Sequence, residues 1–100
     1  MVEVVWTVPA LADLDAIADY IAIENPSAAA ELVQRVFAHV EQLKDHPRSG
    51  SKPPELEGPR YRQIIEPPCR VIYRAHRARV YILYVMRSEQ LLRKNMLTRS

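Results

Sequence analysis

The chain has 100 residues, 48% of them hydrophobic, and a formal net charge of +2 at pH 7. This length provides one domain with one modest core, and the apolar fraction is too high for a disordered protein. No apolar run approaches the ~20 residues that cross a bilayer, and the single cysteine, Cys69, excludes an internal disulfide framework. Residues 1–6 lack the features of a signal peptide, so we expect one cytoplasmic domain spanning residues 1–100.

The net charge hides an uneven distribution along the chain. Residues 1–50 carry three basic and eight acidic side chains, a formal −5, whereas residues 51–100 carry eleven basic and four acidic ones, a formal +7. The basic half is also the half that predicts β-strands, so its arginines are expected to gather on one sheet. A concentrated cationic surface on a small protein usually faces phosphate or an acidic partner.

Residues 2–7 predict a short strand, because apolar side chains recur at every second position and give it one apolar face. A helix follows from Pro9, a residue that starts a helix without losing a hydrogen bond, and Thr7 stands just upstream as its cap. The helix is expected to stop at Asn25-Pro26, because a residue that precedes proline resists the helical conformation. Its acidic side chains form a solvated outer face.

A second helix is predicted directly after the first, with Asn25 as its cap and Pro26 in its first turn. Its apolar stripe runs from Ala29 to Leu43. So short a break between helices forces them into an antiparallel hairpin. Residues 46–54, which hold three of the eight prolines, end the second helix with a loop.

Three strands are predicted after this loop, at Tyr61–Glu66, Arg70–Ala75 and Arg79–Arg87, and a short helical segment is predicted within residues 88–100. The second strand would place Val71 and Tyr73 on one face and Arg70, Ile72 and Arg74 on the other. The third would place Val80, Ile82, Tyr84 and Met86 on one face and Tyr81, Leu83 and Val85 on the other. The order β-α-α-β-β-β predicts an α+β fold, with an antiparallel helix hairpin packed on a small, mainly antiparallel sheet.

Several residue groups, in this order and spacing, resemble one family. They are Trp6-Thr7-x-x-Ala10-x-x-Asp13-Leu14-x-x-Ile17-x-x-Tyr20-Ile21, Asn25-Pro26-x-Ala28-Ala29, Leu43-x-x-x-Pro47-x-x-Gly50, Arg70-Val71-Ile72-Tyr73-Arg74 and Val80-Tyr81-Ile82-Leu83-Tyr84-Val85. Together they resemble the RelE/ParE superfamily of toxins from bacterial type II toxin–antitoxin modules. The Trp-Thr opening and the long helix hairpin look more like ParE than RelE.

The resemblance implies two candidate activities and an inhibitor. ParE-type toxins are associated with poisoning DNA gyrase, whereas RelE-type toxins cleave messenger RNA in the ribosomal A site. Either kind is held inactive by an antitoxin, here a ParD-like protein encoded by the neighbouring gene, in a toxin–antitoxin hetero-oligomer. A third reading is a binding module that keeps the fold without the toxicity. We expect no cofactor and no metal, because the histidines are scattered and Cys69 has no ligand at metal spacing.

The chemistry of the basic half favours the gyrase poison. RNA cleavage through a ribose 2′-hydroxyl needs a base, an acid and a charge that stabilises the phosphorane. Arginine supplies the charge but is a poor base, and His76 is expected to be an exposed turn residue. After the last strand, where the family often shows His-x-Arg-Arg, this chain reads Arg87-Ser88-Glu89-Gln90. A non-enzymatic poison needs only a binding surface.

Two sets of residues are therefore predicted to bind partners. The candidate target-binding residues are Arg62, Arg70, Arg74, Arg87, Arg93 and Lys94. The candidate antitoxin-binding residues are Leu14, Ile21, Arg70, Ile72 and Arg74. Seven arginines lie within residues 60–87 beside a single acid, Glu66. An unpaired set of this size repels itself, which favours a bound partner, and a solvated sheet face is the alternative.

Overall fold

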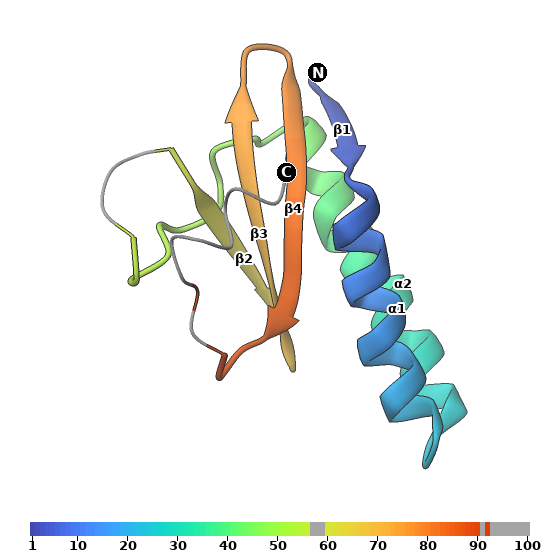
Figure 1. The fold of residues 1–100 in the computed structure, drawn as a ribbon. Helices are drawn as coiled ribbons and strands as arrows, with labels where there is room; N and C mark the ends of the chain where they lie inside the picture. Colours follow the sequence, from blue (N-terminus) through green and yellow to red (C-terminus); the bar gives the residue numbers. More distant parts are fainter. Residues whose placement is uncertain (57–59, 91, 93–100) are drawn as a thin grey trace.

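The computed structural model describes residues 1–56, 60–90 and 92. Its elements are β1 (Glu3–Trp6), α1 (Val8–Ala22), α2 (Pro26–Glu41), the 3₁₀ turn η1 (Gln42–Lys44), β2 (Arg62–Glu66), β3 (Cys69–His76) and β4 (Arg79–Arg87). The two α-helices lie together on one side of the sheet, which confirms the predicted order and the α+β class (Figure 1). None of the helices in the described ranges is long and apolar enough to cross a membrane. The helical segment predicted within residues 88–100 lies mostly outside the described residues.

The side chains predicted to cap the helices do so. The Thr7 hydroxyl accepts a hydrogen bond from the Ala10 amide at 3.3 Å and donates one to the Ile82 carbonyl at 2.7 Å, so it also ties α1 to β4. The Asn25 side chain accepts from the Ala28 amide at 3.0 Å at the start of α2. Each cap pairs a backbone N–H that the helix cannot pair itself.

The sheet has the strand order β1-β4-β3-β2. β1 runs parallel to β4, whereas the β2–β3 and β3–β4 pairs are antiparallel, so the sheet is mainly antiparallel as predicted. Ser51, in the loop after η1, pairs with Gln63 on the outer edge of β2. This loop therefore covers part of an edge that would otherwise present unpaired backbone groups.

A bulge in β4 corrects the predicted alternation of its side chains. Ile72 pairs with Tyr84 and Tyr73 pairs with Ile82, so Leu83 is an extra residue that shifts the register. Such a residue reverses which face the following side chains point to. The helix-facing core holds Val80, Ile82 and Val85, whereas Leu83, Tyr84 and Met86 join a cluster on the opposite face. The prediction that Val80, Ile82, Tyr84 and Met86 share a face was wrong.

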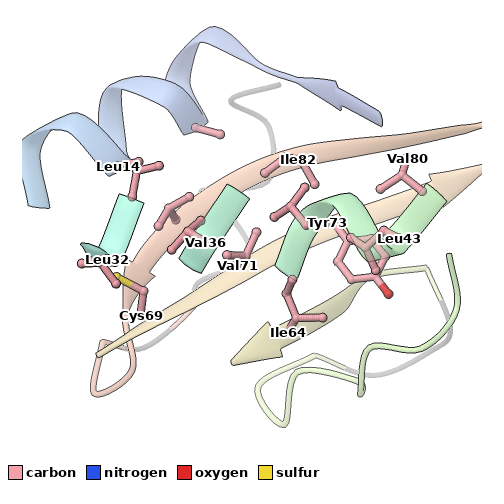
Figure 2. Packing of buried hydrophobic residues seen from close by; sticks show 13 residues of the cluster. Leu14, Leu32, Val36, Leu43, Ile64, Cys69, Val71, Tyr73, Val80 and Ile82 are labelled. Carbon is pink, nitrogen blue, oxygen red and sulfur yellow. The ribbon is translucent and has the colours of Figure 1, made fainter. Parts of the chain in front are cut away.

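Apolar side chains bury the sheet on both faces. On the helix side, Leu14 and Val36 meet Val71 and Tyr73, and none of these four side chains is more than 2% exposed (Figure 2). On the far side, Ile72 belongs to a second cluster. Full burial of such a side chain contributes roughly 1.5–3 kcal/mol, so both clusters stabilise the fold.

Candidate functional site

The face of the sheet turned away from the helices carries some of the arginines that the sequence predicted to gather on one sheet. Because side chains alternate along a strand, Arg70, Arg74 and His76 lie on the same face of β3 as Ile72, which packs in the far cluster. Arg79 of β4 pairs with His76 and shares this face. The environments of these arginines differ sharply, and that difference decides which of them can contact a partner.

Arg70 is buried, with 4% of its surface exposed. Its guanidinium donates to both carboxylate oxygens of Glu55, to the side-chain oxygen of Gln63 at 2.9 Å and to the Gln90 carbonyl at 2.6 Å. The Arg70 hydrogen bond, reinforced by the Leu92 amide, lowers the pKa of the Glu55 carboxyl to about 2 despite its burial. The prediction that Arg70 contacts a target or an antitoxin is thereby corrected, because its donors are turned inward.

Arg62 holds a loop. Its guanidinium donates to the Gly50 carbonyl at 2.8 Å, and the Gly50 amide donates to the Tyr73 hydroxyl at 3.0 Å. A Cβ at Gly50 would lie 2.6 Å from both the Gln63 carbonyl oxygen and the Tyr73 hydroxyl. Only glycine therefore fits this contact between the loop and the sheet. Arg62, predicted as a target contact, is half-buried and positions the loop.

Arg74 and Arg87 keep partly exposed side chains, and each lies over an aromatic ring. The Arg74 guanidinium lies 5.7 Å from the centre of the Tyr81 ring, and that of Arg87 lies 5.7 Å from the Tyr20 ring. Cation–π contacts of this kind contribute about 0.5–1 kcal/mol at exposed sites and limit the motion of the cation. Arg74 and Arg87 therefore remain candidates for target binding. Arg93 and Lys94, also predicted, lie outside the described residues.

The sheet arginines are better paired than the sequence suggested. Three pair with acids from outside residues 60–87: Arg70 with Glu55, Arg79 with Glu3, and Arg87 with Glu89. Glu66, the single acid inside that range, bonds Arg35 at 3.3 Å and His39 at 3.2 Å on α2 instead. The expectation of an unpaired set was wrong for these three of the seven arginines. The pairs of Arg70 and Arg79 could not be predicted, because Glu55 and Glu3 are distant in sequence, whereas Glu89 stands two residues after Arg87.

The structure places some of the predicted antitoxin contacts in the core and others at the surface. Leu14 is 2% exposed and Ile72 is fully buried, so both are core residues and not surface contacts. Ile21, by contrast, lines a depression of about 410 Å³ at the tip of the helix hairpin. Next to it, Tyr20 is 65% exposed and Ile23 78% exposed. Neither Tyr20 nor Ile23 was named as a contact, although both are large apolar residues close to the hairpin break.

The described residues offer positive charge without an oriented base on this face. His76, at the end of β3, is exposed as predicted, and within the described ranges no hydrogen bond orients its ring. Cys69 is fully buried, and burial raises the pKa of its thiol, so it is no ready nucleophile. Among the residues described, no cluster of histidine, cysteine and acidic side chains could hold a metal ion. The arrangement suits binding to an anionic partner.

Comparisons with known proteins agree on one family. The family model for the ParE toxin of the type II toxin–antitoxin system parDE matches residues 4–92. A toxin named Y4kP from Sinorhizobium fredii is 38% identical over 85 residues, which cover 85% of this chain and 86% of that protein. The toxin RelE2 of Caulobacter vibrioides is 44% identical over 50 residues, which cover 50% of this chain and 57% of that protein.

A solved structure of the chromosomal ParDE toxin–antitoxin system from P. aeruginosa matches with a TM-score of 0.75 and 32% identity. The match covers 89% of this chain and 98% of that one. The chain therefore belongs to the ParE family of toxins from type II toxin–antitoxin systems.

Proposed function

We propose that the protein is a non-enzymatic poison of DNA gyrase that acts in the cytoplasm and is neutralised by a ParD-like antitoxin. Membership of the ParE family carries this proposal, since the ParE resemblance implies gyrase as the target. The far face of the sheet supports it, because Arg74 held over Tyr81 suits binding and the face lacks an oriented base within the described residues.

A ribosome-dependent endoribonuclease is the second candidate. It is favoured by the 44% identity with the toxin RelE2 over half of this chain. A nuclease would need a proton acceptor beside the arginines, and His76 is the histidine on that face. A binding module without toxicity is the third reading, since one fold supports different functions.

The antitoxin partner is proposed on two surfaces. Antitoxins of this kind are acidic and fold on the toxin surface, and such segments bind with apolar anchors and complementary charge. The depression at the hairpin tip, lined by Ile21 and flanked by Tyr20 and Ile23, offers the apolar anchor site. Arg74 and Arg87 offer the charge.

Supercoiling by purified gyrase, with and without the protein, tests the proposal. We expect inhibition together with accumulation of cleaved DNA, and we expect both effects to disappear when the neighbouring-gene product is added. If gyrase is unaffected and ribosome-bound messenger RNA is cut, the protein is the nuclease and the gyrase proposal is wrong. Unaffected gyrase and intact messenger RNA would leave the binding module.

A further inference from the structure

We propose that the end of the β3–β4 hairpin binds the backbone of duplex DNA directly. We call this site the hairpin patch, and it consists of Arg74, His76, Arg77, Arg79 and Tyr81. The inference rests on the proposed function, because a poison of gyrase meets DNA in the gyrase–DNA complex. It goes further in giving the toxin a DNA contact of its own.

The hairpin patch lies where the β3–β4 hairpin extends past β2, so β3 forms the edge of the sheet there, while β1 pairs with β4 on the other side. The β2–β3 pairing ends at Arg62 and Tyr73, so within the described residues β3 has no neighbour on that side from Arg74 onward (Figure 1). Arg74 pairs with Tyr81 and His76 with Arg79, which places all four on one face.

The charge of the hairpin patch is dense and only partly neutralised. Arg74, Arg77 and Arg79 lie within six residues. In the described part of the chain, one acid, Glu3, forms an ion pair with the patch, at 3.0 Å from Arg79. Tyr81 and Glu3 raise the pKa of Arg79 above its usual value, so it stays charged. The Arg74 Nε is buried and has no hydrogen-bond partner among the residues that the structure describes. Arg77, in the turn, has a φ of 55° and an exposed side chain.

The composition of the hairpin patch fits nucleic acid better than protein. Protein interfaces centre on large apolar or aromatic anchors, whereas DNA interfaces are polar and strongly positive. Small residues stand beside the arginines, namely Ala75 after Arg74 and Ala78 between Arg77 and Arg79. Among the described residues, none of the large exposed apolar side chains belongs to the β3–β4 hairpin. Arg74 and His76 lie roughly 7 Å apart along the strand, at ~3.3 Å per residue, which sets two hydrogen-bonding side chains along a phosphate backbone.

Fluorescence anisotropy with a labelled 20-base-pair duplex and the purified full chain, without gyrase, tests the inference. We expect binding whose affinity falls with salt, with a slope of about −0.9 per phosphate contacted. The double variant Arg74→Ala/Arg77→Ala should weaken binding on the order of tenfold and reduce the slope by roughly 1.8. The control Arg48→Ala/Lys52→Ala removes the same charge from exposed loop positions and should change neither.

Three results would overturn the inference. One is equal DNA binding by wild type and the Arg74→Ala/Arg77→Ala variant. Another is equal weakening by the control, which would mean that net charge alone acts. The third is a glutamate-rich peptide that binds as tightly as the duplex and loses affinity in the same variant, which would make the patch a site for an acidic protein.

The charge-preserving variant Arg74→Lys/Arg77→Lys is the control for misfolding. It keeps both positive charges, so it should keep most of the dependence of DNA affinity on salt. If the protein poisons gyrase but does not bind the duplex, the DNA-binding inference is refuted and the proposed function stands. If the protein binds the duplex but does not affect gyrase, the proposed function is refuted and the DNA-binding inference stands.

Discussion

Arg70 and Glu55 form a bidentate ion pair, in which the arginine side chain is 5% exposed and the glutamate side chain 16% exposed. The same two side chains bond the Gln90 carbonyl and the Leu92 amide. Leu92 is itself buried in the far cluster with Ile72. The pair therefore joins the loop before β2, the central strand β3 and the segment after β4, which places Arg70 in the framework and not on the binding surface.

Replacing Arg70 and Arg74 should have different consequences for stability. Arg70→Ala leaves the Glu55 carboxylate buried without its countercharge and should lower the free energy of unfolding by about 3–5 kcal/mol. Arg74→Ala loses a cation–π contact with Tyr81 and should cost about 0.5–1 kcal/mol. Urea unfolding of both variants measures the difference. Equal losses would contradict the framework role, and toxicity is best tested in Arg74→Ala alone.

The ion pair also predicts a pH dependence. The pKa of Glu55 is lowered from 4.5 to about 2, chiefly by the Arg70 hydrogen bond. A carboxyl whose pKa is depressed by folding contributes stability that is complete above its unfolded value and is lost as the pH falls toward its folded value. The melting temperature of wild type should therefore exceed that of Glu55→Gln at pH 7, and the difference should shrink between pH 4.5 and about 2. A constant difference across that range would argue against this linkage.

Gly50→Ala tests the close contact between the loop and the sheet. The added Cβ would meet the Gln63 carbonyl oxygen at 2.6 Å, a backbone atom that cannot rotate away. Overpacking of this kind costs typically about 1–3 kcal/mol. Thermal unfolding should show the loss, and the neighbouring exposed Ser49→Ala should unfold close to wild type. A Gly50→Ala protein as stable as wild type would show that the loop moves aside.

Local signals in the sequence predicted the elements that depend on neighbouring residues. Thr7 and Asn25 cap their helices because the donors they satisfy lie three residues away, so spacing alone identifies them. The order of the elements followed from periodicity for the same reason. Gly50 was noticed as part of a spaced motif, but its close contact with Tyr73 is visible only in the fold.

Features that depend on distant residues could not be predicted this way. The bulge at Leu83 leaves an unbroken apolar run in the sequence, so strict alternation assigned Tyr84 to the wrong face. Arg70 looks like any sheet arginine because its partner, Glu55, lies in an irregular loop 15 residues earlier. The error on Arg70 affected the site, since it placed on the surface a side chain that the fold buries.

Tyr73 should make the protein sensitive to alkaline pH. Burial raises the pKa of its hydroxyl above 10.0, because the phenolate would lose its water. A group whose pKa is raised by folding contributes stability that is complete below its unfolded pKa and is lost as the pH rises through the folded one. Tyr73→Phe removes the acceptor of the Gly50 amide and should cost about 1 kcal/mol at pH 7.

Melting temperatures from pH 7 upward measure this effect. The advantage of wild type over Tyr73→Phe should shrink above pH 10, since the variant has no hydroxyl to ionise at this position. Tyr20→Phe, at a position 65% exposed, should follow the wild-type curve. A difference in melting temperature between wild type and Tyr73→Phe that stays constant above pH 10 would exclude Tyr73 as the group that causes the alkaline sensitivity.

The tip of the helix hairpin should anchor the antitoxin. Ile23 and Val8 are both 78% exposed and stand at opposite ends of α1, which makes them a matched pair. Ile23→Gln removes an apolar side chain beside the depression lined by Ile21 and should weaken binding of the neighbouring-gene product by roughly tenfold, as loss of an interface anchor does. Val8→Gln should leave the affinity unchanged. Calorimetric titration of both variants decides the point, because equal affinities would place the antitoxin elsewhere, whereas a loss confined to Ile23→Gln would locate one of its anchors.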